Sequence, residues 1–465
     1  MKKPLLILSF ILGSLSLNFA VTPKNNNWWV FGQNAAIDFN NSTATAVSGK
    51  PIVTYDNTAS ICTDNGRLLF YTDGVTIWDS TDAVMLNGDS LMGNVTAGQE
   101  ALIVPVPDNS LYYVFTVKEF GSGGLYYSVV DRTLNNGLGA VTTTKNVLLS
   151  SPTTEKLIGY YDETHARFWV ITHDYGNNNF KCYKVDSHGL DSIPVISSVG
   201  SANSGGTYGY DNGAMGQMVI SQDGRHIANA LEYSDAIELL DFDTQTGIIS
   251  NPVTINNQNS AWGVAFSPDG SKLYSTNWLY QAVSQWDLSV YTQTAIQASH
   301  TNIGNAVGTG SYHAGYLQLA PDGKIYVARY GSPYLATISS PDSLGLSCGF
   351  TANGFNLGSG TSRAGLSSIL VFPGAFTGIN DIHIEEMTSM VYPNPANFEF
   401  SIVVENELSL KTTIQFINTI GQSVVIPSYI EGNKCKVQCE GIAKGSYFYI
   451  LTDRSKIARG KIIID

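Results

Sequence analysis

WGVAFSPDGSKLYSTNWLYQAVSQWDLS, residues 262–289, is the stretch that decides the fold of this chain. It contains three short runs of strand-forming residues, Gly263–Phe266, Lys272–Thr276 and Ala282–Asp287. Pro268-Asp269-Gly270 separates the first two runs, and turn residues of this kind between short strands are typical of an antiparallel hairpin. The stretch therefore predicts three consecutive antiparallel strands.

The same unit recurs along most of the chain. Its predicted hairpin turns fall near residues 65, 108, 162, 223, 269 and 322. This spacing is close to the ~40–50 residues of a four-stranded propeller blade, and long surface loops account for the excess. An opening meander, residues 28–48, has three strands but no inner strand. The repeats therefore predict a β-propeller.

Gly365–Phe372 (GLSSILVF) is a spare strand at the end of the repeats. Placed as the inner strand of the opening meander, it would close a ring of seven blades without an open sheet edge. Rings of six or eight blades are the alternatives.

The composition agrees with an all-β fold. Charged residues make up 14% of the chain, against about 25% in an average globular domain. Aromatic and β-branched residues favour strands, and Gly and Asn favour the turns between them. Helical periodicity is lacking after the first twenty residues.

The N-terminus predicts export. Two lysines precede an apolar run, Pro4–Phe19, which ends at Ala20. This pattern is typical of a secretory signal peptide cleaved after Ala20, residues 1–20. The run is shorter than the about 20 residues that a membrane span needs. We therefore expect a mature chain with no integral membrane segment.

The charge is acidic and unevenly distributed. Without Lys2 and Lys3 the formal charge changes from −13 to −15. Residues 390–465 contain eight Lys/Arg and seven Asp/Glu, so residues 21–389 carry −16. An acidic body argues against nucleic acid and anionic lipid as partners, and it also suits simple solubility.

Two of the five cysteines, Cys435 and Cys439, are predicted to be buried thiols. Cys435 and Cys439 lie on one face of a predicted strand, with Cα atoms about 13 Å apart, beyond the about 7 Å reach of a disulfide. Neither has a nearby histidine to complete a zinc site. We expect no metal and no cofactor. The stretch Asp241–Gly247 begins like a calcium loop but lacks the closing carboxylate.

The predicted propeller spans residues 21–376, and about residues 28–373 of it resemble a group of exported Bacteroidetes proteins of the gliding-motility-associated, WD40-like type. The matching stretches are Leu69–Trp78 (LFYTDGVTIW), Ala101–Pro105 (ALIVP), Leu319–Tyr326 (LAPDGKIY) and Ser362–Leu366 (SRAGL). Members commonly have Leu-Pro after the last Gly, where this chain has Leu366-Ser367. The group has no single agreed activity, so the resemblance implies the fold.

After a linker at 377–390, residues 391–465 form short alternating strands that suit a small Ig-like β-sandwich. This tail resembles the type A C-terminal sorting domain of the type IX secretion system. The resemblance rests on Tyr392, Pro393, Asn394 and Pro395 at its head, on Gly421 and Gln422, on Gly445 and Tyr447, and on the basic-then-apolar end Arg459–Ile464. It implies the secretion machinery as partner and a secreted or surface-attached protein.

Candidate binding residues come from the propeller geometry. The start of each inner strand borders the mouth of the central channel, where ligands commonly bind. Reading this position blade by blade gives Ser60, Glu100, Glu155, Gln217, Trp262, Gln318 and Arg363. These groups suit a sugar or a peptide, or they bond one another and channel water.

Three functions remain open at this point. The first is an exported binding protein without catalysis, whose ligand is a protein or a glycan and which serves adhesion or surface interaction. The alternative is a carbohydrate-active hydrolase or lyase that uses Glu100 and Glu155, and it requires two carboxyl groups about 5–9.5 Å apart. A purely structural role is the third.

Overall fold

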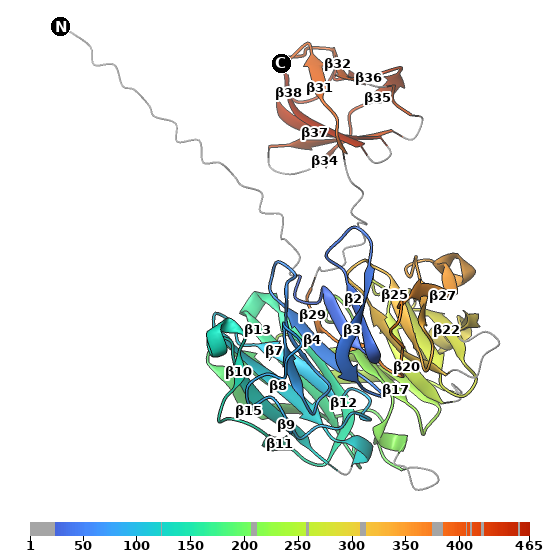
Figure 1. Cartoon of the computed structure of the whole chain (residues 1–465). Helices are drawn as coiled ribbons and strands as arrows, with labels where there is room; N and C mark the ends of the chain where they lie inside the picture. Colours follow the sequence, from blue (N-terminus) through green and yellow to red (C-terminus); the bar gives the residue numbers. More distant parts are fainter. Residues whose placement is uncertain are drawn as a thin grey trace. The chain divides into compact units, whose positions relative to one another are not determined.

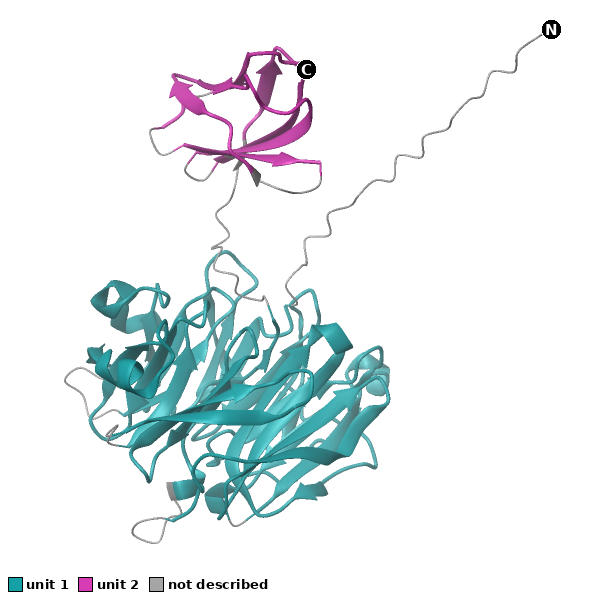
Figure 2. Cartoon of the chain, turned by 180° about the vertical axis from the view of Figure 1, so that it is seen from behind, with its two compact units in different colours: residues 1–378 teal, residues 379–465 magenta. Residues whose placement is uncertain are grey.

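A computed structural model describes residues 24–121, 123–205, 212–256, 260–306, 313–373, 385–405, 407–409, 412–419, 423–453 and 456–465. The chain divides into two compact units, residues 1–378 and residues 379–465 (Figure 2). Each unit has hydrophobic cores of its own. The signal peptide expected at residues 1–20, with its cleavage site at Ala20, lies outside the described residues.

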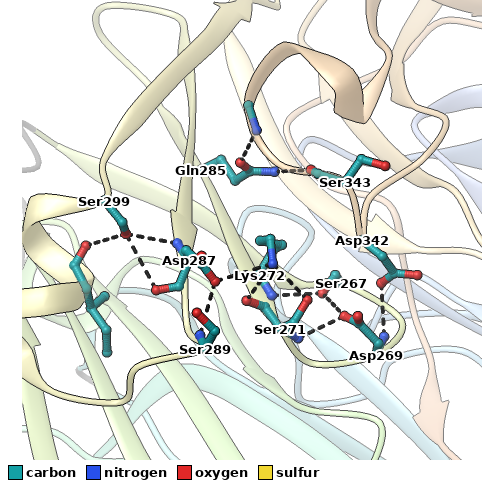
Figure 3. Close-up of polar contacts among 12 residues, drawn as sticks. Ser267, Asp269, Ser271, Lys272, Gln285, Asp287, Ser289, Ser299, Asp342 and Ser343 are labelled. Carbon is teal, nitrogen blue, oxygen red and sulfur yellow. Dashed lines mark hydrogen bonds and ion pairs between the residues drawn. The ribbon is translucent and has the colours of Figure 1, made fainter.

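The stretch at residues 262–289 forms the predicted strands: β20 (Ala261–Phe266), β21 (Lys272–Asn277) and β22 (Ala282–Asp287). The turn between β20 and β21 is held by its own side chains (Figure 3). Asp269 Oδ1 accepts hydrogen bonds from Ser271 N and Ser267 Oγ, both at 2.8 Å, and Ser267 Oγ accepts one from Lys272 N at 2.9 Å. Gly270 has φ +72°, which a side chain rarely allows, so the Asp-Gly pair is what this turn requires.

The described part of unit 1 contains seven sheets that follow one another along the chain (Figure 1). The first is β1 (Trp28–Phe31), β2 (Gln33–Asp38) and β3 (Thr45–Val53). The second is β4 (Thr58–Cys62), β5 (Leu68–Thr72) and β6 (Ile77–Asp79), and the third is β7 (Ala101–Pro105), β8 (Leu111–Val117), β9 (Leu125–Asp131), β10 (Ala140–Val141) and β11 (Val147–Ser150). The fourth is β12 (Thr153–Asp162), β13 (Arg167–Asp174), β14 (Asn179–Asp186) and β15 (Gly189–Ser198).

The remaining three sheets have four strands each. They are β16 (Met218–Ile220), β17 (His226–Leu231), β18 (Ala236–Phe242) and β19 (Ile249–Ile255); β20 to β22 with β23 (Thr301–Asn305); and β24 (Ala314–Leu319), β25 (Ile325–Arg329), β26 (Tyr334–Ile338) and β27 (Phe350–Asn356). Helical segments are short: α1 (Gln293–Ala298) and the 3-10 turns η1 (Glu119–Gly121), η2 (Asn135–Gly137), η3 (Glu163–His165), η4 (Asn212–Ala214) and η5 (Gly345–Cys348).

Neighbouring sheets pack face to face and close a ring. The inner strands β4, β7, β12, β16, β20 and β24 contact one another in this order. The first sheet packs against the last, where the rings of Trp29 and Phe39 each lie 5.7 Å from that of Tyr326, edge to face. The predicted all-β fold is therefore confirmed.

The predicted pairing of Gly365–Phe372 with the opening meander is wrong. β28 (Ser367–Ser368) pairs in parallel with β4, and β29 (Leu370–Val371) pairs in parallel with β12. Leu366 belongs to the core of the first and last sheets, whereas Leu370 and Phe372 belong to that of the second to fourth sheets. Because this segment is apolar on both faces, it needs burial from several sides, which the ring centre supplies and one blade does not.

The two ends of the propeller region do meet, as predicted. Asn26 Nδ2 donates a hydrogen bond to Leu370 O at 2.7 Å, and Gln33 forms an antiparallel bridge with Thr361. The segment 366–372 thus ties the last residues of unit 1 to its first strands.

Unit 2 consists of two sheets around one core. One sheet is β31 (Ser389–Tyr392), β32 (Glu399–Val404), β36 (Lys434–Gln438) and β35 (Ser428–Glu431); the other is β30 (Glu385–Glu386), β38 (Lys456–Ile464), β37 (Gly445–Asp453), β33 (Thr413–Asn418) and β34 (Ser423–Val424). Strands begin at Glu385, ahead of Val391, the predicted start of the domain. The five cysteines are free and buried, as predicted for Cys435 and Cys439.

Candidate functional site

The ring has two ends that differ in kind. The inner strands start at one end, here named the mouth, and the turns at Asp223, Asp269 and Asp322 lie at the other, here named the hairpin end. Segment 366–372 runs parallel to β4 and β12 and so passes from the mouth toward the hairpin end. There the ring of Phe372 lies 5.6 Å from that of Tyr161, near the end of β12.

Two of the predicted mouth residues lie deeper, in the channel. Gln217 Oε1 accepts hydrogen bonds from Val264 N at 3.0 Å and Leu317 N at 3.2 Å, and its Nε2 donates to Leu317 O at 2.8 Å. Gln217 and Gln318 line a cavity of about 50 Å³ together with Ile369. A space of this size holds one or two waters, at ~30 Å³ each. Gln217 therefore ties inner strands together, whereas Gln318 Nε2 donates to Leu319 O of its own strand at 3.2 Å.

Gln99, which the sequence prediction missed, makes a second such tie. Its Nε2 donates to Leu157 O at 3.2 Å and Met218 O at 2.9 Å, and its Oε1 accepts from Met218 N at 2.8 Å. Gln99 lies directly before the predicted residue Glu100. The residue that precedes each inner strand was therefore the signal that could have found it.

The two predicted carboxylates are buried at the mouth. Glu155 is 2% exposed, and its oxygens accept from Gly98 N at 2.6 Å and Phe120 N at 2.7 Å. Glu100 is fully buried and accepts from Thr54 Oγ1 at 3.3 Å. Since both carboxyl groups are enclosed and bonded to the protein, they act as internal acceptors for the loops around the mouth.

Burial raises the pKa of both carboxyl groups. It raises the pKa of Glu155 to about 7, although the amides of Phe120 and Gly98 and the charge of Lys156 act in the opposite direction. Burial, together with the charges of Asp73 and Asp56, raises the pKa of Glu100 well above its usual range. The pKa of Asp56 is raised by burial and by Glu155. The mouth is therefore less negative at neutral pH than its formal charges imply.

Tyr316 occupies the centre of this acidic group. It is 1% exposed, and a methyl group on Gly98 would lie 2.2 Å from Tyr316 Oη and 3.1 Å from Glu155 Oε2, so Gly98 admits both side chains. Burial raises the pKa of Tyr316, with added effects of Asp56 and Glu155, so the phenol keeps its proton. Within the described residues, Tyr316 Oη has no hydrogen-bond partner.

A column of aromatic rings leads outward from Tyr316. Trp262 stacks on Tyr316 with ring centroids 5.6 Å apart, Trp278 lies 4.8 Å from Trp262, and His313 stacks on Trp278 at 4.6 Å. We name Tyr316, Trp262, Trp278 and His313 the aromatic column. Tyr316 is buried, and the other three rings are half-buried. The column thus connects the buried carboxyl groups with the surface of the mouth.

Arg363 borders the column. Its guanidinium lies 5.2 Å from the ring of Tyr330 and 5.6 Å from that of Tyr55, and Tyr330 contacts Trp278 at 6.1 Å. Arg363 Nη2 donates to Gln33 Oε1 at 2.7 Å. Arg363 Nε and Trp262 Nε1 are buried atoms that have no hydrogen-bond partner in the described parts of the chain. The mouth therefore holds unused donors beside its aromatic rings.

The sequence prediction placed Trp262 and Arg363 at the mouth but missed Trp278 and Tyr330. Both follow the second strand of their sheets directly, after β21 and β25. An aromatic residue at this matching position in two consecutive repeats was the signal that could have found them.

The head of the C-terminal motif holds the last strand of unit 2. Asn394 Nδ2 donates to Lys461 O at 3.1 Å, and its Oδ1 accepts from Ile463 N at 2.9 Å. Gly445 starts β37, and Tyr447 Oη donates to Ala443 O at 2.7 Å. Gly421 and Gln422 lie outside the described residues.

Two searches of the described residues bear on metals and membranes. No cluster of three or more His, Cys, Asp or Glu side chains there suits a metal ion. The helices in that part of the chain are too short or too polar to cross a membrane.

Residues 390–465 match the family model described as the secretion system C-terminal sorting domain. Since this match covers unit 2, the chain carries a type IX sorting domain, which indicates export to the cell surface or the medium. The class defined by fold and comparison is thus an exported all-β protein with a propeller-like body and a C-terminal sorting domain.

Solved structures resemble the chain in fold alone. A protein from Lactobacillus plantarum is 15% identical, with a TM-score of 0.37, and the match covers 80% of this chain and 96% of that one. Kluyveromyces lactis Hsv2 is 10% identical with a TM-score of 0.40, covering 68% and 90%. The β-propeller domain of Myceliophteria thermophila Cps50 (Swd1) is 10% identical with a TM-score of 0.39, covering 65% and 93%. No protein with a curated description matches the chain.

Proposed function

We propose that this protein is an exported binding protein whose propeller mouth takes a protein or glycan ligand in adhesion or another surface interaction. One observation carries the proposal: the aromatic column starts at the buried hydroxyl of Tyr316, which has no hydrogen-bond partner among the residues that the structure describes, and ends in half-buried rings at the surface. Buried polar atoms are normally hydrogen-bonded, so unused groups beside aromatic rings are typical of a binding site.

Export supports the same function. The secretion machinery is the partner of residues 390–465, and the signal peptide predicted at residues 1–20 delivers the chain to the periplasm first.

The two carboxyl groups of the catalytic alternative, Glu100 and Glu155, are both enclosed by the protein. A glycosidase needs one carboxyl to donate a proton and another to attack or to activate water. Glu155 uses both of its oxygens for backbone amides, and Glu100 is fully buried against Thr54. The raised pKa values of these residues follow from their burial.

Glycan and peptide arrays test the binding function. The chain from residue 24 to residue 465 should bind a restricted set of ligands, and Trp278→Ala should weaken that binding about tenfold or more, because a buried aromatic anchor contributes at least 1–2 kcal/mol. Tyr280→Ala is the matched control, since Tyr280 follows the same strand, is 66% exposed and lies outside the aromatic column. If Trp278→Ala and Tyr280→Ala bind the ligand equally strongly, the ligand does not bind at the aromatic column of the mouth.

Cell fractionation tests the export route. In a host with a type IX secretion system, a chain that ends at Pro373 should stay in the periplasm, and the full chain should reach the surface or the medium. Arrival of the shortened chain at the surface would contradict the role of residues 390–465.

A further inference from the structure

A groove of about 600 Å³ lies at the hairpin end, between the first and second sheets. Ligand pockets in proteins typically have volumes of about 300–1,000 Å³. Its lining includes the cations Lys24, Lys50 and Arg67 and the ring of Trp28. No lining residue is acidic, although residues 21–389 carry −16. The groove is therefore a basic site on an acidic body.

The floor of the groove is held in place by the protein itself. Lys50 Nζ lies 5.5 Å above the ring of Trp28 and 5.8 Å from that of Tyr71, and it pairs with Asp82 at 2.8 Å. The residue is 8% exposed, so this cation is fixed beside the ring. Asn40 Nδ2 donates to Gly66 O at 2.8 Å and so ties the first sheet to the turn of the second. The floor therefore presents an aromatic ring in a defined position.

The rim carries two cations that are available for a ligand. Lys24 and Arg67 are exposed, and neither forms an ion pair within the part of the chain that the structure describes. Two carboxylates lie nearby: Asp64 Oδ1 accepts from Asn25 Nδ2 at 3.0 Å, and Asp38 Oδ1 accepts from Asn40 Nδ2 at 2.7 Å. Among the described residues neither forms an ion pair with Lys24 or Arg67, so both cations are free to contact an anionic group of a ligand.

These features select one kind of ligand. A guanidinium presents a planar fork that matches carboxylate and sulfate groups, and an ammonium adds a point charge. An aromatic ring between such cations suits the C–H face of a sugar ring, since that face is apolar. Amide side chains such as that of Asn65 suit its hydroxyl groups.

We propose that this groove binds an acidic glycan, with the sugar ring on Trp28 and its anionic group between Lys24 and Arg67. Carboxylate and sulfate share the required charge and shape, and the two sources are separated by the choice of probe. The site is distinct from the mouth, because its residues belong to residues 24–80 at the opposite end of the ring.

Titration calorimetry with three polysaccharide probes tests the proposal. Oligoalginate carries carboxylates, dextran sulfate carries sulfates, and dextran is the neutral reference. We expect the chain from residue 24 to bind at least one of the two anionic probes and not dextran, and the preferred probe identifies the anionic group. The double variant Lys24→Gln/Arg67→Gln should weaken this binding about tenfold or more, by the loss of two charge-assisted contacts.

Lys324→Gln is the matched control, because Lys324 is a cation of the hairpin end outside the groove that pairs with Asp322 at 3.1 Å. Its affinity for the anionic probe should stay within about twofold of that of the unchanged chain. Three outcomes would overturn the proposal. The double variant could bind the anionic probe as tightly as the control does, the unchanged chain could bind dextran as tightly as an anionic probe, or the unchanged chain could bind neither anionic probe. Because Trp278→Ala leaves this groove intact, its effect on the array ligands tests the mouth independently.

Discussion

The two ends of the ring both place aromatic rings beside charged groups, but they treat charge in opposite ways. At the mouth, Glu100 and Glu155 are enclosed, and burial raises their pKa values. At the hairpin end, Lys24 and Arg67 are exposed to solvent. The net charge of the chain therefore describes neither site, since acidic groups are buried at one end and cations are exposed at the other.

The largest effect is expected for the segment that links the two ends. A chain that ends at Ser359 loses Leu366, Leu370 and Phe372 from the cores and leaves β4 and β12 without their parallel partners. Loss of a buried Leu or Phe side chain costs about 2–5 kcal/mol each, and together they reach the total stability of a typical domain, about 5–15 kcal/mol. We expect no cooperative unfolding transition in urea.

A chain that ends at Pro373 is the control for this truncation, because it also lacks unit 2 but keeps the segment. It should melt cooperatively as a monomer. If the chain that ends at Ser359 melts in the same way, segment 366–372 does not hold the ring together.

A smaller effect, of a few kcal/mol at most, is expected from pH at the mouth. Glu155, with its pKa raised from 4.5 to about 7, adds stability that is complete below pH 4.5 and is lost as pH rises through about 7. Burial lowers the pKa of Lys156 from 10.5 to about 7, so its contribution is complete above pH 10.5 and is lost as pH falls through about 7. Together these two groups give a minimum in the unfolding free energy near pH 7.

Urea unfolding across this pH range, with Glu155→Gln beside the unchanged chain, measures the effect. The variant should lose the decline between pH 4.5 and about 7 and keep the rise above it, since Lys156 remains buried and its pKa remains lowered by that burial. Parallel profiles for the two proteins would show that Glu155 does not titrate in this range.

The smallest effect is expected for the rim of the groove. Lys24→Gln/Arg67→Gln removes two exposed cations, and such surface changes alter the unfolding free energy by about 0.5 kcal/mol or less. Chemical denaturation of the double variant checks this. A loss of several kcal/mol in unfolding free energy would mean that these cations support the fold. The contrast between enclosed charges at the mouth and free charges at the rim would then be wrong.

The sequence predicted those parts that local chemistry decides. The Ser-Pro-Asp-Gly turn at Asp269 forms the hairpin that its residues require, and Trp262 and Arg363 lie at the mouth as their strand positions indicate. The cysteines could be read as buried because their spacing ruled out a bridge. Each of these conclusions depends on neighbours within a few residues.

Other features depend on long-range packing that no local pattern contains. The sequence of Gly365–Phe372 predicts a strand, but the strands with which it pairs depend on its packing into three hydrophobic cores and not on its own pattern. Gln217 directly precedes β16, and Gln318, which the sequence placed at the start of an inner strand, lies near the end of β24, so both side chains line the channel cavity. Lys24, Lys50 and Arg67 belong to separate segments, and only the folding of the first two sheets brings them to one groove.

Tyr316→Phe tests most directly the claim that the mouth keeps polar atoms for a ligand and not for the fold. The substitution removes a buried hydroxyl that has no partner among the described residues, and an unpaired buried hydroxyl costs about 1–3 kcal/mol. Affinity for the array ligand and unfolding free energy should be measured on the same protein samples. We predict that affinity falls about tenfold while the unfolding free energy stays the same or rises by about 1 kcal/mol. Lower stability with unchanged affinity would contradict the account.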